Sequence, residues 1–232
     1  MKWRSLEESK PGQDTRSLGE QFAERKALIE KLVPAAIQAI HRQVVEDLRR
    51  SGIAARALQP GAQAPAFDLP DHNGKHITSA ELLSRGRLIL CFIRGRWDPF
   101  CCGQLEAMNA YRSRFEQAGA VVAFISPQTV KHSFFMHDQH KPLFPLLSDA
   151  SNQVARQFGL VYRVPNTPPT DQQEIYRRVF VNLPNTNGDP SWELPIPATY
   201  VIDRGGTILF ASANPDYTER PEPEEILMAL QL

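Results

Sequence analysis

Apolar residues recur every three or four positions between residues 18 and 52. Those that set the pattern are Val33, Ile37, Ile40, Val44 and Leu48. This period places them on one face of a helix. Because proline cannot occupy a helix interior, we expect two helices, one ending near Val33 and the next carrying Pro34 in its first turn. Their apolar face needs a partner, which we expect to be the rest of the chain; a dimerisation arm is the alternative.

The pattern changes after Gly52. Proline, glycine, aspartate and asparagine separate short extended pieces around Phe67 and Ile77, as expected of strands joined by turns. We therefore divide the chain into an N-terminal helical extension over residues 1–57 and a main domain over residues 58–232.

Strands and helices alternate in the main domain. A continuous apolar run at 88–93 predicts a strand covered on both faces, and residues 101–118 then predict a helix. The later elements are a strand at 121–125, an apolar stretch at 143–147, a helix at 152–158, two hairpin strands at 198–202 and 207–213, and a final helix at 223–230. This order predicts an α/β, thioredoxin-like fold with a central mixed sheet flanked by helices. Residues 165–192, with a helix at 171–180, are interpreted as an insertion over the functional site.

Charge and composition narrow the classes of function. The 26 basic and 26 acidic residues cancel, so neither nucleic acid nor an anionic membrane is an expected partner, and a small neutral substrate is. No run approaches the roughly 18 to 20 apolar residues that cross a bilayer. The opening MKWRSLEESK lacks the apolar stretch of a secretory signal. We therefore expect a cytoplasmic protein.

Three cysteines are too few, and odd in number, for a disulfide framework. Cys91 lies within the apolar strand and is expected to be a buried, inert thiol. A disulfide between the adjacent Cys101 and Cys102 would form a strained ring, because consecutive helical side chains point roughly 100° apart. We therefore expect Cys101 to serve as a reactive thiol rather than as part of a structural disulfide.

The segment FIRGRWDPFCCGQL, residues 92–105, joins the buried strand to the helix. Free N–H groups and the positive end of the helix dipole lie at such a junction and favour a thiolate at Cys101. Asp98 followed by Pro99 is a preferred helix start. The Asp98 carboxylate would compete for the same N–H donors and raise the thiol pKa. Arg94 and Arg96 can offset this by pairing with Asp98 or by contacting the thiolate, and the sequence leaves the two open.

From about Gln59 to the C-terminus the chain resembles the alkyl hydroperoxide reductase and thiol-specific antioxidant (AhpC/TSA) family, particularly its peroxiredoxin-like branch. The matching segments are the motif above together with APAFDLPDHNGK at 64–75, ISPQ at 125–128, FPLLSD at 144–149, VARQFGL at 154–160 and SWELPIPATYVIDRGG at 191–206. The resemblance implies a thiol-dependent peroxidase that reduces hydrogen peroxide or organic hydroperoxides through a cysteine sulfenic acid. It places Cys101 at the peroxidatic position and Pro197 at a cis proline that faces the reactive sulfur.

The chain departs from the family pattern at two positions. Asp98 stands where the peroxiredoxin-like branch has its first cysteine and the wider family has Thr or Ser, and Arg94 stands where the family has proline. A dithiol cycle through positions 98 and 101 is therefore impossible. The predicted catalytic residues are Cys101, Asp98, Arg94 and Arg96, and the predicted substrate pocket comprises Trp97, Pro99, Phe100, Cys102, Pro197 and Thr199.

The partners implied are a peroxide and an external thiol reductant, whether thioredoxin, glutaredoxin or a low-molecular-weight thiol. No cofactor or metal is expected, because His132, His137 and His140 have no second ligand cluster and fit a solvated helix face. A homodimer is left open. Two alternative functions remain: a degenerate thiol-disulfide oxidoreductase, against which Asp98 counts, and a non-catalytic thioredoxin-fold binding protein.

Overall fold

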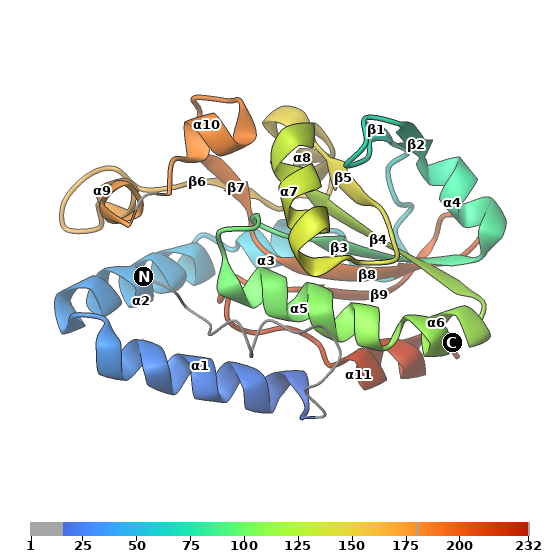
Figure 1. Cartoon of the computed structure of the whole chain (residues 1–232), viewed down its shortest axis with the longest axis horizontal. Helices are drawn as coiled ribbons and strands as arrows, with labels where there is room; N and C mark the ends of the chain where they lie inside the picture. The colour runs from blue at the N-terminus through green and yellow to red at the C-terminus, as the bar shows by residue number, and fades with distance from the viewer. Residues whose placement is uncertain (1–15, 180, 232) are drawn as a thin grey trace.

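A five-stranded mixed sheet lies at the centre of the computed structural model, which describes residues 16–179 and 181–231 (Figure 1). The strand order is β5-β4-β3-β8-β9. Three strands are parallel, namely β3 (Arg87–Phe92), β4 (Ala120–Ser126) and β5 (Leu146–Ser148), whereas β8 (Ala198–Ile202) and β9 (Ile208–Ala213) form an antiparallel hairpin. Since β3 pairs with both β4 and β8, it joins the parallel strands to the antiparallel hairpin. The predicted α/β, thioredoxin-like arrangement is confirmed.

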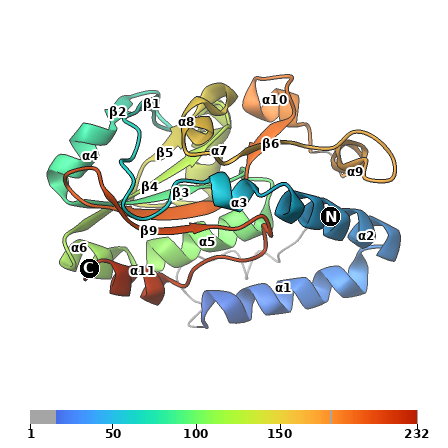
Figure 2. The same cartoon turned by 180° about the vertical axis from the view of Figure 1, so that it is seen from behind.

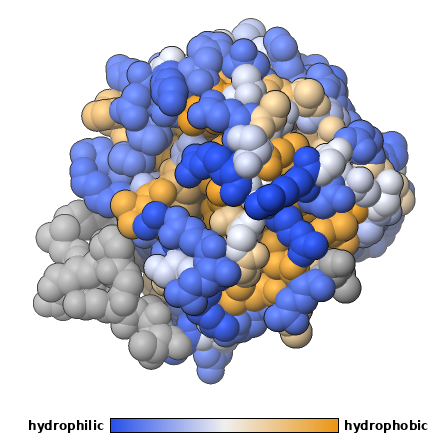
Figure 3. All heavy atoms as spheres, turned by 90° about the vertical axis from the view of Figure 1, so that its right-hand side faces the viewer, coloured by the Kyte–Doolittle hydropathy of each residue, from blue (hydrophilic) through white to orange (hydrophobic). Residues whose placement is uncertain are grey.

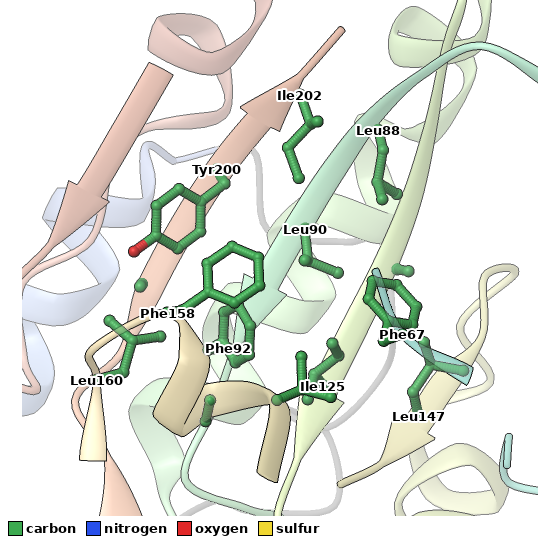
Figure 4. Close-up of a cluster of buried hydrophobic side chains, with 14 of the residues drawn as sticks. Phe67, Leu88, Leu90, Phe92, Ile125, Leu147, Phe158, Leu160, Tyr200 and Ile202 are labelled. Carbon is green, nitrogen blue, oxygen red and sulfur yellow. The ribbon is translucent and has the colours of Figure 1, made fainter. Parts of the chain in front are cut away.

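Alternate residues of β3 enter two hydrophobic cores, one on each face of the sheet, because successive strand side chains point to opposite faces. Leu88, Leu90 and Phe92 lie on one face (Figure 4). There Phe158 packs between Phe92 and Tyr200, with ring centroids 4.8 and 5.0 Å apart. The residues between them on β3, which include Cys91, enter the other core together with Cys101. The two cysteines therefore lie on the same side of the sheet.

Short helices cover both faces. The first core is covered by α3 (Ile53–Arg56), α4 (Ser79–Arg85) and α8 (Gln153–Gln157), which follows the 3-10 turn Ala150–Asn152. The second is covered by α5 (Pro99–Ala110), α6 (Arg112–Gln117), α7 (Val130–His140) and α11 (Pro223–Ala229). The single helix predicted over 101–118 is thus two helices that meet at Tyr111, whose φ of −89° and ψ of −2° interrupt the helical geometry.

The N-terminal extension begins, within the described residues, as two helices, α1 (Leu18–Leu32) and α2 (Ala35–Arg50). Ser17 and Glu20 form a capping box at the start of α1. Pro34 is the N-cap of α2, one position before the predicted first turn. Helix α1 lies along α5, and α2 contacts α9 (Figures 1 and 2). The expectation that these helices pack on the rest of the chain is confirmed.

The insertion forms a third, smaller hydrophobic cluster beside Trp97. It contains α9 (Gln172–Arg178) and α10 (Leu183–Asn187), flanked by the antiparallel pair β6 (Val161–Arg163) and β7 (Glu193–Pro195). A further short pair, β1 (Asp68–Pro70) and β2 (His76–Thr78), lies near α4 (Figure 1). The helix predicted at 171–180 corresponds to α9, which ends at Arg178. Phe180 lies outside the described residues.

The surface mixes hydrophilic side chains with several apolar patches on the side where α4 and α6 lie (Figure 3). Among residues 16–179 and 181–231, no helix has both the length and the apolar character needed to cross a membrane. The opening segment MKWRSLEESK lies outside the described residues.

Candidate active site

The loop between β3 and α5 positions Cys101 as the third residue of α5. Asp98 is the N-cap, and its Oδ1 accepts a hydrogen bond from the Phe100 N–H at 3.0 Å, with Pro99 at the first helical position. The predicted helix start is confirmed. The loop turns at Gly95, whose φ of +142° requires glycine, and a Cβ there would lie 2.9 Å from Trp97 Nε1.

The sulfur of Cys101 is completely buried. Its thiol donates to Asp98 Oδ2 at 2.9 Å, while Sγ accepts from the Arg94 backbone N–H at 3.4 Å and lies 3.8 Å from Arg220 Nη2. Burial, followed by the Asp98 charge, raises the pKa of Cys101 to about 12. The predicted thiolate is therefore wrong for this conformation, because desolvation and Asp98 outweigh the two arginines and the N–H donor. Cys101 is a neutral thiol.

Arg94 and Asp98 form a buried ion pair, which decides between the two roles left open for the arginines. Both Nε and Nη2 of Arg94 lie 2.9 Å from Asp98 Oδ2. Burial alone would raise the pKa of Asp98, but Arg94 and then Arg220 hold it below its usual range. Asp98 is thus an anion that accepts the thiol proton's hydrogen bond, and Arg94 is its counterion.

Aromatic side chains from separate segments enclose Arg94. The Arg94 guanidinium carbon lies 3.8 Å from the Tyr217 ring centroid and 5.0 Å from that of Trp97. Arg94 Nη1 also donates to the Tyr176 hydroxyl at 3.3 Å. Burial raises the pKa of Tyr176 and takes that of Tyr217 to about 12, so both phenols are neutral. Sequence reasoning missed the two tyrosines, because they lie about 80 and 120 residues after Arg94.

A chain of hydrogen bonds orients Arg220 toward the sulfur. Arg220 Nε donates to Gln104 Oε1 at 2.9 Å, and Gln104 Nε2 donates to Thr199 Oγ1 at 3.0 Å. Thr199 was predicted as a pocket residue; it is fully buried and acts behind Gln104 rather than beside Cys101. Arg220 and Gln104 were missed. The polar turn around Arg220 offers no local signal, whereas Gln104 lies one helical turn after Cys101, a spacing that a helical projection could have found.

Arg96 and Cys102 lie away from the sulfur. The Arg96 side chain is exposed and bonds His132 Nδ1 at 3.4 Å, while its backbone N–H donates to Gln128 Oε1. The predicted catalytic contact of Arg96 with Asp98 or Cys101 is therefore not formed. The Cys102 thiol donates to the Arg96 carbonyl at 3.3 Å, and burial raises its pKa.

The remaining cysteine is buried in the sheet. Cys91 has no exposed surface, and burial raises its pKa to about 12. Its sulfur accepts a long hydrogen bond from Thr199 Oγ1 at 3.8 Å. All three cysteines are free thiols.

Pro197 departs from the expectation drawn from the family. Among the described residues the cis peptide bond joins Pro168 and Pro169, so the bond before Pro197 is trans. The chain passes extended from β7 into β8, with the Ile196 N–H bonded to the Leu160 carbonyl and the Pro197 carbonyl to the Asn214 N–H. These backbone hydrogen bonds on both sides of Pro197 are consistent with an extended chain and a trans peptide bond.

The three histidines of residues 132–140 have separate partners. His132 contacts Arg96, the His137 ring stacks on His72 at 3.7 Å between centroids, and His140 Nδ1 bonds Glu106 at 2.9 Å. Within residues 16–179 and 181–231, no group of three or more His, Cys, Asp or Glu side chains is arranged to hold a metal.

Several proteins that are similar in sequence to this chain carry peroxiredoxin names. A Mycobacterium tuberculosis protein provisionally named a peroxiredoxin is 28% identical over 157 residues, which cover 68% of this chain and 86% of that protein. Peroxiredoxin Q of Sedum lineare is 26% identical over 184 residues, covering 79% and 83%. A Coxiella burnetii protein provisionally named peroxiredoxin bcp is 32% identical over 106 residues, covering 45% and 69%.

Solved structures share the fold. Peroxidoxin BcpB of M. tuberculosis matches with a TM-score of 0.58 and 22% identity over 75% of this chain and 97% of that one. Reduced Prx3 of Vibrio vulnificus, in complex with hydrogen peroxide, matches with a TM-score of 0.58 and 16% identity over 75% and 99%. The AhpC/TSA family model matches residues 60–211, which include β3, the start of α5 and β8. The chain therefore belongs to the AhpC/TSA family.

Proposed function

We propose that this protein is a thiol-dependent peroxidase that reduces hydrogen peroxide or an organic hydroperoxide at Cys101. The observation that carries the proposal is the position of the Cys101 sulfur at a strand-to-helix junction, between the Arg94 N–H and the Arg220 guanidinium, in a member of the AhpC/TSA family. Both donors can stabilise negative charge on sulfur or on a peroxide oxygen. The peroxiredoxin names of its relatives support the same activity.

The proposed reaction begins from the thiol and uses Asp98 to move its proton. The sulfur of Cys101 attacks one peroxide oxygen; an S–O bond forms as the O–O bond breaks, and the second oxygen leaves as water or an alcohol. As the S–O bond forms, the thiol proton becomes acidic and moves along its 2.9 Å hydrogen bond to Asp98 Oδ2, which passes it to the leaving oxygen. Sulfur loses two electrons, the peroxide gains them, and Asp98 ends as the carboxylate it was.

The sulfenic acid then needs an external thiol. Cys91 is sealed within the sheet, and the Cys102 thiol is directed to the Arg96 carbonyl, so neither is placed to resolve it. One external thiol displaces water to form a mixed disulfide with Cys101. A second external thiol releases the Cys101 thiol and leaves the reductant as a disulfide. A thioredoxin, a glutaredoxin or a low-molecular-weight thiol satisfies this balance.

Replacement of Cys101 by Ser tests the assignment. Peroxide consumption with a fixed dithiol reductant is expected to fall to the uncatalysed rate in Cys101→Ser, and to persist in Cys91→Ser and Cys102→Ser. Equal consumption by Cys101→Ser and the wild type would refute the assignment of Cys101, and if both rates equal the uncatalysed rate, the non-catalytic binding role takes its place. Mass spectrometry of the peroxide-treated wild type, with a sulfenic-acid trap, locates the oxidised residue.

We also expect a cytoplasmic location, because a reducing compartment preserves the three free thiols.

We place the boundary between the helical extension and the peroxidase domain between residues 57 and 58. A homodimer remains open, and light scattering of the reduced protein tests it.

A further inference from the structure

We propose that α1 and the loop of residues 214–222 form a clasp, closed by Glu222, that controls access to Cys101. The inference rests on the proposed function, because a cover matters only to a cysteine that must meet a substrate. The loop connects β9 to α11 and carries Tyr217 and Arg220. Tyr217 lies on Arg94, and Arg220 reaches the Cys101 sulfur, so the loop lies between the sulfur and α1.

Glu222 binds the first turn of α1 from about 200 residues away in sequence. Its Oε2 accepts from the Leu18 N–H at 3.0 Å, and its Oε1 accepts from the Gly19 N–H at 2.6 Å. These are N–H groups that have no partner within a helix, and the helix dipole favours a carboxylate beside them. Glu222 is also the N-cap of α11. One carboxylate therefore ties α1 to the end of the loop that carries Arg220.

Phe22 provides the apolar part of the clasp. Its ring lies edge-on to Phe100, with centroids 5.0 Å apart, and it is 4% exposed. A Cβ on Gly103 would come within 2.8 Å of the Phe22 ring, so α1 rests directly on α5 at this point. The Arg25 guanidinium also donates to the Pro99 carbonyl, in the first turn of α5. These contacts lie on one side of α1 and hold it over the start of α5.

A groove marks where the clasp meets solvent. It has a volume of about 320 Å³ and lies between α1 and the loop, lined by Phe22 and Lys26 on one side and by Thr218 and Arg220 on the other. Arg220 is the lining residue that also touches Cys101 Sγ, at 3.8 Å. Release of Glu222 from α1 frees the loop that carries Arg220. When α1 and the loop move apart, the loop can leave the sulfur, which has no exposed surface in the closed state, and a peroxide can then reach it.

The experiment measures the rate at which iodoacetamide alkylates Cys101 at one pH, with the modified residue located by peptide fragmentation. Glu222→Gln is expected to raise the rate about five- to tenfold, the factor that corresponds to a lost helix cap. Glu225→Gln is the matched control, because Glu225 belongs to the capping box of α11 and makes none of the bonds to α1. Its rate is expected to equal that of the wild type.

A second pair of variants tests the apolar contact. Phe22→Ala is expected to accelerate alkylation as Glu222→Gln does, whereas Leu28→Ala, on the exposed side of α1, is not. Cys91 is the internal reference, since it reacts only when the sheet opens. An unchanged Cys101 rate in Glu222→Gln and Phe22→Ala overturns the clasp, as does an equal rise at Cys91 or in Glu225→Gln. Faster alkylation without Cys101-dependent peroxide consumption retains the clasp and refutes the proposed function.

Discussion

The thiol of Cys101 donates to Asp98 Oδ2 across 2.9 Å, and the same oxygen receives Nε and Nη2 of Arg94. One carboxylate oxygen thus connects the sulfur to a buried cation. The Asp98 charge raises the pKa of Cys101 and so favours the thiol over the thiolate. Arg94 lowers the pKa of Asp98 and so keeps the carboxylate ionised. The Asp98 charge therefore adds to burial in keeping Cys101 protonated.

Asp98→Ser is expected to lower the pKa of Cys101 from about 12. The substitution removes the negative charge next to sulfur and leaves Arg94 and Arg220 to stabilise a thiolate. Serine also retains the helix cap and supplies the hydroxyl that the family resemblance places here. A titration of thiolate ultraviolet absorbance checks the shift, with Cys91→Ser and Cys102→Ser added so that only Cys101 contributes. An unchanged pKa would show that burial alone sets it.

Asp98→Cys is expected to form a reversible disulfide with Cys101. The Asp98 side chain already reaches within 2.9 Å of Sγ, and residues three apart at a helix start can adopt disulfide geometry. Oxidation should remove two free thiols per chain, and dithiothreitol should restore them. Peptide mapping distinguishes this link from one to Cys102. Failure to form it would mean that the helix start is displaced from the described position.

Arg94→Met is expected to lower the free energy of unfolding by about 3–5 kcal/mol, because it leaves the buried Asp98 carboxylate without its counterion. The double variant Arg94→Met with Asp98→Leu removes both charges and should recover much of the loss. Urea unfolding of the wild type, both single variants and the double variant completes the cycle. Additive losses would contradict the ion pair.

The strands of the central sheet were predictable because their apolar runs are continuous and buried on both faces. The helix start at Asp98 was predictable because aspartate before proline is a local signal. The burial of Cys101 was not, since Arg220, which contacts its sulfur, approaches from a loop far along the chain. The trans bond before Pro197 was also missed. The cis bond was expected from the family resemblance alone, and no local contact in the sequence indicated either isomer.

Gly103→Ala is expected to raise the rate of Cys101 alkylation, and its effect on stability is expected to be small, because the helix propensity gained in α5 offsets part of the lost Phe22 packing. Alanine favours a helix interior over glycine by about 1 kcal/mol, so α5 itself gains. The new methyl group would lie 2.8 Å from the Phe22 ring and displace α1. In a Phe22→Ala background the same substitution should have no further effect on alkylation. Alkylation kinetics measure the displacement of α1, and urea unfolding measures the change in stability. Slower alkylation would contradict the described packing of α1.

His41 of α2 should make the protein less stable in mild acid. Its Nδ1 pairs with the Gln172 side-chain amide at 2.9 Å, and its ring lies 6.2 Å from that of Tyr217. Burial, followed by the charge of Arg94, lowers the pKa of His41 from 6.5 to about 4. His41 therefore binds a proton below about pH 6.5 in the unfolded chain but only below about pH 4 in the folded protein. The free energy of unfolding decreases as the pH falls through this window.

The loss from His41 at pH 5 is about 2 kcal/mol relative to pH 7, from the two pKa values and the linkage relation. Other groups titrate in the same range, so the informative quantity is the difference from His41→Asn, whose side-chain oxygen can accept the Gln172 amide but does not titrate. Urea unfolding at both pH values should give a smaller decrease for His41→Asn than for the wild type by about that amount. Equal decreases would mean that His41 is protonated as readily in the folded protein as in the unfolded chain, and that α2 does not bury it against the aromatic side chains around Arg94.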